Sequence, residues 1–246
     1  MAKKQRLDKA IAMQGSLSRS EVKTLIRKGA VTVNGQVVKN ADFGVDFYSD
    51  TVAVQGKELS LSMHIYLMLN KPKGVVSASE DKKLPTVVDL VPKELWRKGL
   101  FPAGRLDKDT TGFVLITDDG EFAHDILSPK KHISKTYHAL VNGTITDEMV
   151  EGFAKGVTIG EDFTLPASLK KISSEEQGDW GEVILKEGMY HQIKRMFGAY
   201  GLKVLELKRV QMGKLPLDPN LEEGKCRELT AEELRLVSTR DESTEE

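Results

Sequence analysis

The chain has 246 residues, enough for one large domain or a large domain with a small companion. With 39% hydrophobic and 30% charged residues it should bury an ordinary globular core. No apolar run approaches the roughly 20 residues that cross a bilayer, and the first residues lack the apolar stretch of a signal peptide. A single cysteine, Cys226, excludes an internal disulfide and a multi-thiolate zinc site. We therefore expect a cytoplasmic protein that does not bind membranes.

The net charge of −1 conceals an uneven distribution. Residues 1–40 hold nine Lys or Arg against two acids, whereas residues 222–246 hold nine acids against four basic residues. A basic head is suited to a polyanion, because each neutralised phosphate releases condensed counterions. A solvated helix face explains the same charges equally well. The acidic end, residues 239–246, is most simply a disordered, solubilising tail.

Residues 1–60 have the pattern of a compact unit. Apolar spacing predicts a short helix near residues 7–13 that ends at Gly15. Ser18 stands three residues before Glu21, the spacing of a capping box, and predicts a second helix that Gly29 closes. Residues 31–38 predict a hairpin around an Asn-Gly turn, and a further strand follows at 51–54. Basic residues concentrated on the two helices suit an RNA-docking module.

This segment resembles the small RNA-binding domain named after ribosomal protein S-four. The matching motifs are at residues 6–9, 18–21, 25–29 and 31–35. The resemblance implies that the helical pair presents a basic face to structured RNA. The residues expected on that face are Lys9, Arg19, Lys23, Arg27 and Lys28. Such domains occur in proteins of many activities, so this motif indicates RNA but no particular reaction.

A linker around residues 57–64 leads to a second domain, for which we take residues 61–238. Strands are predicted near 65–70, 113–117, 136–141, 182–186 and 203–208, and helices near 121–127, 147–155, 189–200 and 231–238. Strands interspersed with few helices favour an α+β fold on a mixed, mainly antiparallel sheet over regular βαβ winding.

The densest polar stretch is the loop 104–112, which runs into an apolar strand and contains Asp107. Such a loop could present a reactive carboxylate, although an aspartate that organises an Asx turn is the commoner reason for one. A calcium loop is a third interpretation, because Asp107, Asp109, Thr111 and Asp118 stand close to the EF-hand spacing. An EF-hand needs a helix on each side, and the two glycines and the proline of residues 98–104 disfavour the first.

Two further clusters lie at residues 134–138, which include Tyr137, and at 187–197. The second has an apolar face typical of a core helix, with Lys194 and Arg195 leaving it about 100° apart. Seven basic residues between 186 and 214 predict a second positive patch. The sequence has no HExxH, GxxxxGK[ST], GxSxG or GxGxxG motif, so metal and nucleotide cofactors are disfavoured.

Taken in order, these clusters resemble the pseudouridine synthases, and most closely their RsuA branch, which modifies small-subunit ribosomal RNA. The matching segments are Gly104-Arg105-Leu106-Asp107 with Thr110 and Gly112, then Lys135-Thr136-Tyr137, Glu187-Gly188 with His191-Gln192-Ile193-Lys194-Arg195-Met196, and Leu69-Asn70-Lys71-Pro72-Lys73-Gly74. Four ordered motifs are far more specific than any single loop. Phe113 and Asp118 stand where the family more often has Leu and Asn.

The resemblance implies that Asp107 is the catalytic carboxylate, acting at the ribose of the target uridine. Tyr137 would pack on the flipped base and Lys194 would pair with Asp107, so that the carboxylate stays charged in a dry pocket. The remaining substrate-binding residues implied are Arg105, Leu106, Thr110, Gln192, Arg195 and Leu207. The reaction is redox-neutral and implies no cofactor and no metal.

The implied partner is 16S ribosomal RNA, either free or in a small-subunit assembly intermediate, with uridine-516 as the target, and we expect a monomer. One alternative is an enzyme of the same family that acts on 23S, large-subunit RNA. Another is a non-enzymatic ribosome-assembly factor, for which Asp107 would be dispensable. A calcium-binding regulator is the third.

Overall fold

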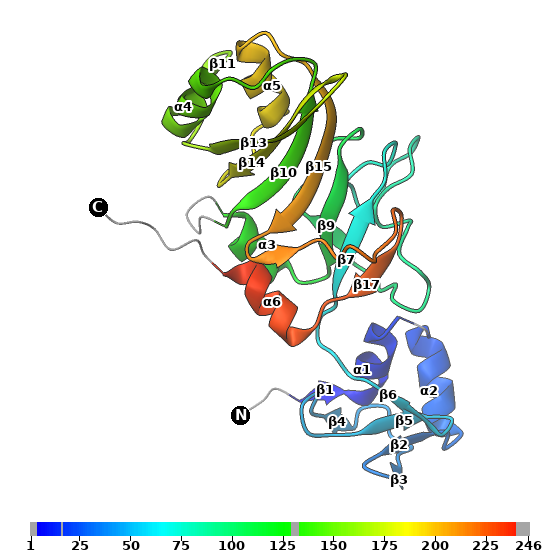
Figure 1. Ribbon diagram of the computed structural model, residues 1–246. Helices are drawn as coiled ribbons and strands as arrows, with labels where there is room; N and C mark the ends of the chain where they lie inside the picture. The colour runs from blue at the N-terminus through cyan, green and yellow to red at the C-terminus, as the bar shows by residue number, and fades with distance from the viewer. Residues whose placement is uncertain (1–3, 16, 129–132, 240–246) are drawn as a thin grey trace. The chain divides into compact units, whose positions relative to one another are not determined.

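The computed structural model describes residues 4–15, 17–128 and 133–239. The chain divides into two compact units (Figure 1). The small unit comprises the residues up to Ile65 together with Val91–Leu100, and the large unit comprises Tyr66–Leu90 and the residues from Phe101 onward. The tail predicted at residues 239–246 lies, apart from Thr239, outside the described residues. None of the described helices has the length and apolar character to cross a membrane.

The small unit contains the two predicted helices. Its helices are α1 (Leu7–Met13) and α2 (Arg19–Arg27). The capping box is present: the backbone N–H of Glu21 donates to Ser18 Oγ over 3.3 Å, and the Ser18 N–H donates to the Glu21 carboxylate over 2.7 Å. These bonds satisfy amide groups that a helix start leaves without partners, which is why α2 begins here.

A four-stranded sheet follows the helices in the order β3-β2-β5-β6. Its strands are β2 (Val31–Val33), β3 (Gln36–Val37), β5 (Val52–Val54) and β6 (Lys57–Leu59), and β1 (Gln5–Arg6) pairs separately with β4 (Gly44–Val45). The predicted hairpin is confirmed: Asn34 and Gly35 both have positive φ, 50° and 79°, as the turn requires. The linker expected at 57–64 is wrong at its start, because residues 57–59 pair with β5.

Residues 91–100 pack within the small unit, although 25 residues of the large unit precede them in the chain. The guanidinium of Arg97 donates to Gln14 Oε1 over 2.7 Å and to the Ser62 carbonyl over 3.1 Å. The sequence predicts neither contact, because residues 91–100 have neither helical nor strand periodicity.

The large unit is built on a mixed, mainly antiparallel sheet of nine strands, which confirms the predicted α+β class. The main order is β13-β14-β10-β15-β9-β7-β17, with β16 beside β15 and β8 beside β9. These strands are β7 (Tyr66–Lys71), β8 (Phe101–Ala103), β9 (Thr111–Thr117), β10 (Lys135–Val141), β13 (Ser168–Glu175), β14 (Gly178–Leu185), β15 (Val204–Met212), β16 (Leu215–Pro216) and β17 (Cys226–Glu228). Among the strands of this sheet in the described residues, β15 and β9 pair in parallel and the other pairs are antiparallel.

Four helices accompany this sheet in the described part of the large unit: α3 (Gly120–Leu127), α4 (Asp147–Lys155), α5 (Gln192–Ala199) and α6 (Ala231–Ser238). In Figure 1, α4 and α5 lie with β11 (Thr158–Ile159) near one end of β10 and β15, and α3 and α6 lie near the other end. β11 pairs with β12 (Asp162–Phe163).

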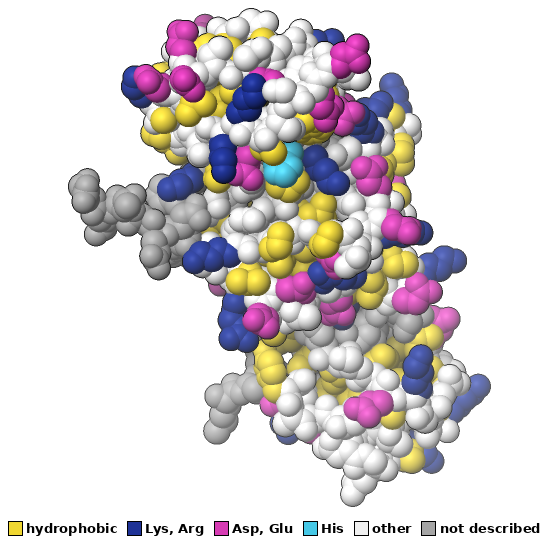
Figure 2. Space-filling view, viewed as in Figure 1, with side chains coloured by type: hydrophobic (Ala, Val, Ile, Leu, Met, Phe, Trp, Pro, Cys, Tyr) yellow, Lys and Arg dark blue, Asp and Glu magenta, His cyan; other side chains and the backbone are white. Residues whose placement is uncertain are grey.

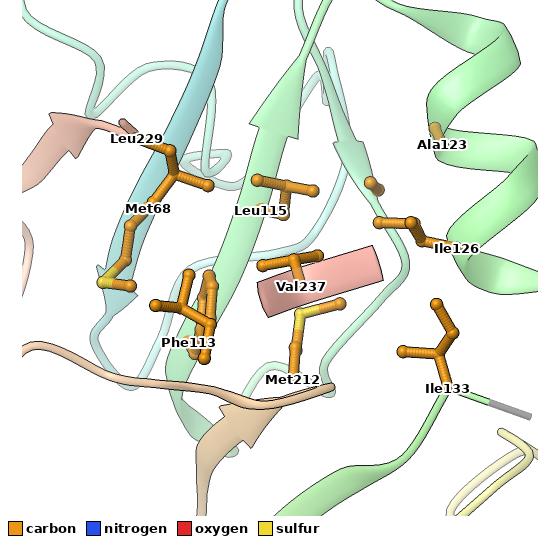
Figure 3. Close-up of a cluster of buried hydrophobic side chains, with 11 residues drawn as sticks. Met68, Phe113, Leu115, Ala123, Ile126, Ile133, Met212, Leu229 and Val237 are labelled. Atoms are coloured by element: carbon orange, nitrogen blue, oxygen red, sulfur yellow. The ribbon is translucent and has the colours of Figure 1, made fainter. Parts of the chain in front are cut away.

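One apolar core joins α3 and α6 to the sheet (Figure 3). Met68 on β7 faces Leu115 on β9 in register, and Phe113 lies two residues before Leu115 on the same side of the strand. Ile126 of α3 and Val237 of α6 close the cluster. Because its members come from elements on both sides of loop 104–112, this core holds the loop between fixed strands.

Acidic and basic side chains are interspersed over the face shown in Figure 2. The second positive patch, predicted from seven basic residues between 186 and 214, needs a correction. Arg209, on β15, is only 2% exposed, and its Nε donates to the Phe113 carbonyl of the neighbouring strand β9 over 2.7 Å. Its charge therefore belongs to the core of the large unit and adds nothing to a surface patch.

Candidate active site

Asp107 lies in the loop that joins β8 to β9. The loop is a tight turn in which the Thr110 N–H donates to the Asp107 carbonyl over 3.1 Å, and the Asp107 side chain keeps 26% of its surface exposed. The strand begins beside β15, where Gly112 is paired in parallel with Arg209. Gly112 has a φ of +98°, and a Cβ there would lie 2.2 Å from the Arg209 carbonyl oxygen. Only glycine therefore fits at this point of the loop.

Lys71 anchors the loop from beneath. It is fully buried at the end of β7, and its ammonium donates to the carbonyls of Thr110 (2.8 Å), Lys108 (3.3 Å) and Pro72 (3.0 Å). Burial lowers the pKa of Lys71 to about 8, against an ordinary value of 10.5. The sequence predicts no role for this lysine; the available signal is its place in the matching segment 69–74, close behind the apolar residues 67–69.

Lys194 reaches the same loop from α5. Its Nζ lies 3.0 Å from Oδ2 of Asp107 and 2.6 Å from Oδ1 of Asp109. Burial alone would lower the pKa of Lys194, but the hydrogen bonds to Asp109 and Asp107 outweigh it and raise the pKa. The bond from Lys194 in turn lowers the pKa of Asp109. The second carboxylate was noted in the sequence only as a calcium candidate, and in the structure it is paired with an ammonium group.

His191 stands at the start of α5 in an unusual conformation. The helix predicted at 189–200 begins only at Gln192, because His191 adopts the left-handed region with φ 49° and ψ 35°. This conformation breaks the helical path and places Nε2 of His191 3.5 Å from Oδ1 of Asp107. The imidazole thus lies near one carboxylate oxygen and Lys194 near the other.

These side chains surround a cavity of about 90 Å³. The residues predicted at the site that line it are Arg105, Leu106, Asp107, Thr110, Tyr137, Gln192, Lys194 and Leu207. Further lining residues, to which the sequence had given no role, are Leu185, Gly188, Met189, His191 and Ile193. Arg195 does not line the cavity: its guanidinium donates to the Ile159 carbonyl and lies 3.4 Å from Asp162.

The walls of the cavity differ in character. Tyr137 of β10 is 8% exposed and Leu207 of β15 is 7% exposed, so this side is apolar and aromatic. Thr110 is 2% exposed, and its hydroxyl has no hydrogen-bond partner among the described residues. Gln192 is satisfied, with its amide bonded to the Glu187 carboxylate over 2.7 Å. The site therefore combines a flat hydrophobic wall, one free hydroxyl and a carboxylate beside a cation.

The residues predicted to contact RNA lie on α1 and α2 or directly after them. Lys9, Arg27 and Lys28 are exposed. Arg19 and Lys23 approach the fully buried carboxylate of Asp8, at 3.0 Å and 3.8 Å. The carboxylate of Asp8 thus fixes the charged groups of these two side chains, which are both about half exposed.

The loop that resembles a calcium-binding loop is not flanked by helices. The loop is preceded by β8 and followed by β9, whereas an EF-hand has a helix on each side. Within the described residues, no group of three or more His, Cys, Asp or Glu side chains is arranged to hold a metal ion.

Comparison with known proteins identifies the family. Residues 65–199 match the model of the RNA pseudouridylate synthases, and residues 5–50 match the S4 domain. The chain is 43% identical over 237 residues to the ribosomal small subunit pseudouridine synthase A of Escherichia coli, covering 94% of this chain and 99% of that one. It is 44% identical to YtzG of Bacillus subtilis, named as an uncharacterized RNA pseudouridine synthase, covering 95% and 98%.

A solved structure agrees with these matches. The crystal structure of a pseudouridylate synthase superposes with a TM-score of 0.63 at 37% identity, covering 94% of this chain and 99% of the other. Both the domain order and nearly the full length are therefore shared. The chain belongs to the RNA pseudouridine synthase family, with an N-terminal S4 domain, and is an isomerase that acts on RNA.

Proposed function

We propose that this enzyme converts uridine to pseudouridine in 16S ribosomal RNA of the small subunit, with uridine-516 as its target. Support comes from the name of the Escherichia coli relative, which matches along nearly the whole chain. The proposed chemistry rests on one observation: Asp107 and Lys194 are paired, 3.0 Å apart, in a cavity that Tyr137 lines. We further propose that the enzyme acts as a monomer in the cytoplasm.

The reaction replaces the C–N glycosidic bond of uridine with a C–C glycosidic bond. The N1–C1′ bond of the uridine breaks, the base rotates, C5 joins C1′, and the C5 proton is lost while N1 gains one. Asp107 acts at the ribose, either as nucleophile on C1′ or as base for the C2′ proton. The ammonium group of Lys194 lies 3.0 Å from Oδ2 of Asp107 and fixes the position of this carboxylate.

The side chains that line the cavity hold the uracil base while it rotates. Leaving the RNA stack costs a few kcal/mol, which stacking on an aromatic side chain partly offsets. Tyr137 supplies that face and Leu207 extends the same wall, while Arg105, Leu106 and Gln192 complete the pocket. The unpartnered hydroxyl of Thr110 is positioned to bond a polar atom of the nucleotide. Arg195, outside the cavity, is assigned to the RNA backbone next to the target.

The small unit supplies sequence-independent affinity. Lys9, Arg19, Lys23, Arg27 and Lys28 place positive charge on the helices, where phosphates can displace counterions. Replacing Arg27 or Lys28 with alanine should weaken RNA binding. The slope of log affinity against log salt should fall by about one for each phosphate that the variant no longer neutralises.

The decisive test is pseudouridine mapping on unmodified 16S and 23S RNA and on a small-subunit assembly intermediate. Wild type should form one pseudouridine, at uridine-516, and Asp107→Asn should form none. Asp147→Asn, the same change at an exposed position on α4, is the matched control and should behave as wild type. A product confined to 23S RNA would overturn the substrate, and equal activity of Asp107→Asn would overturn the role of Asp107.

A further inference from the structure

A large aromatic side chain stands exposed at the rim of the catalytic cavity. Tyr190 has 76% of its surface in solvent, although its neighbours Met189 and His191 both line the cavity. Its ring stacks on the imidazole of His191, with centroids 3.8 Å apart and planes 17° from parallel. One face of the ring is therefore covered, and the other face is open at the edge of the site.

The segment that carries Tyr190 is held in place by hydrogen bonds. The Met189 N–H donates to Gln192 Oε1 over 2.9 Å, and the Gln192 amide donates to Glu187 over 2.7 Å. Arg195 Nη1 lies 3.4 Å from the Tyr190 carbonyl. These bonds fix the backbone around Tyr190, and stacking on His191 restrains the ring itself, so its open face is preorganised for binding.

The left-handed backbone of His191 produces this arrangement. A residue with a Cβ rarely adopts φ 49°, and such conformations persist where the surrounding structure enforces them, often at functional sites. Here the conformation turns the imidazole so that its edge approaches Asp107 at 3.5 Å while its face supports Tyr190. The same residue thus links the catalytic carboxylate to the exposed ring.

We propose that the open face of Tyr190 is a stacking platform for an unpaired RNA base next to the target uridine. When a uridine leaves its stack, the adjoining base loses a stacking partner and needs a new one. An exposed aromatic ring accepts any base, because every base has a π face. Lys194 and Arg195, on the helix that follows, place positive charge near the same rim, as a strand of phosphates requires.

This inference rests on the proposed function, because its probe takes the 16S RNA around uridine-516 as the substrate, and it is tested by binding without turnover. The probe is a hairpin of 16S RNA that contains uridine-516 with 2-aminopurine on either side, since stacking quenches its fluorescence. Wild type and Tyr190→Phe should quench the probe. Tyr190→Ala should lose the quenching and bind roughly fivefold or more weakly, as expected for loss of one base–aromatic stack.

Two controls make the result specific. Tyr48→Ala removes a tyrosine that is 85% exposed in the small unit, and should leave quenching and affinity unchanged. An abasic site in place of the flanking base should abolish the difference in affinity between wild type and Tyr190→Ala. Because Tyr190 is exposed, the variant should unfold at the wild-type temperature.

The outcomes separate the two proposals. Absence of quenching by wild type that has bound the probe, equal quenching by Tyr190→Ala, or an affinity loss that persists with the abasic RNA would overturn the platform. Failure of wild type to bind this hairpin, with quenching of a large-subunit hairpin around the uridine that it does modify, would overturn only the proposed substrate. Wild type that quenches the probe but forms no pseudouridine in any ribosomal RNA would overturn the proposed function and support the platform.

Discussion

The ammonium group of Lys194 on α5 lies 3.0 Å from the carboxylate of Asp107 in the β8–β9 loop. The same ammonium donates a shorter bond, 2.6 Å, to Asp109. One cation therefore serves two carboxylates of one loop, only one of which lines the cavity. We therefore expect substitutions of Asp107 and of Asp109 to have different effects on activity.

Replacing Lys194 with methionine should reduce kcat by about a hundredfold or more, because it removes a preorganised charge next to the reacting carboxylate. Lys194→Arg should recover part of the rate, since it restores the charge with a different geometry. Single-turnover formation of pseudouridine measures the chemical step without product release. An unchanged rate for Lys194→Met would show that the pair has no catalytic role.

Asp109→Asn should cost much less than Asp107→Asn. It removes the competing carboxylate but leaves the Asp107–Lys194 pair and the cavity wall in place. We expect a kcat within about tenfold of wild type, as for a residue that acts only through its neighbour. Loss of activity as complete as that of Asp107→Asn would mean that the two aspartates act as one unit.

Gly112→Ala should destabilise the large unit severely. The new Cβ would lie 2.2 Å from the Arg209 carbonyl oxygen, in a backbone conformation that L side chains rarely adopt. We expect a loss of roughly 3 kcal/mol or more in the free energy of unfolding, together with loss of activity. Gly120→Ala is the control, because a Cβ there meets nothing within 4 Å and the φ is ordinary. Equal thermal stability of the two variants would contradict the close approach.

The stability contribution of Lys71 should depend on pH. Its pKa is about 8 in the folded chain and 10.5 ordinarily, so between these values the unfolded chain binds more protons and wild-type stability rises with pH. Lys71→Met loses three hydrogen bonds to the loop and also loses this rise. Its deficit in the free energy of unfolding should therefore grow from about pH 8 to pH 10.5, as denaturant titrations would measure.

Lys135→Met offers a parallel case, because burial also lowers the pKa of Lys135 to about 8. A deficit that is constant over this range would contradict the expectation.

Asp8 should stabilise the small unit except in acid. Burial opposes its charge, but the hydrogen bonds from Arg6 and Arg19 outweigh burial and lower the pKa of Asp8 to about 2, against an ordinary 3.8. Its contribution is complete above about pH 4 and is lost as the pH falls toward 2. The deficit of Asp8→Asn, followed by hydrogen exchange of the α1 and α2 amides, should accordingly shrink over this window. A deficit that grows in acid would have the wrong sign.

Elements whose hydrogen bonds and apolar contacts are local could be predicted from the amino-acid sequence. The predicted bounds of the helices at 147–155 and 231–238 are confirmed to the residue, because each segment has helical periodicity and directly follows a threonine that caps it. The Asn34-Gly35 turn and the Ser18–Glu21 capping box follow from the same local chemistry. Ordered motifs also placed Asp107, Tyr137 and Lys194 among the candidates, and all three line one cavity.

The meeting of segments far apart in the chain could not be predicted and is known from the folded structure. The parallel pairing of β9 with β15 sets Gly112 against Arg209, and β7 brings Lys71 under the loop. The left-handed turn at His191, which shortens α5, has no local signal, because histidine carries no preference strong enough to predict it. Such features depend on contacts between residues far apart in the chain, and their energies become available only when the sheet has formed.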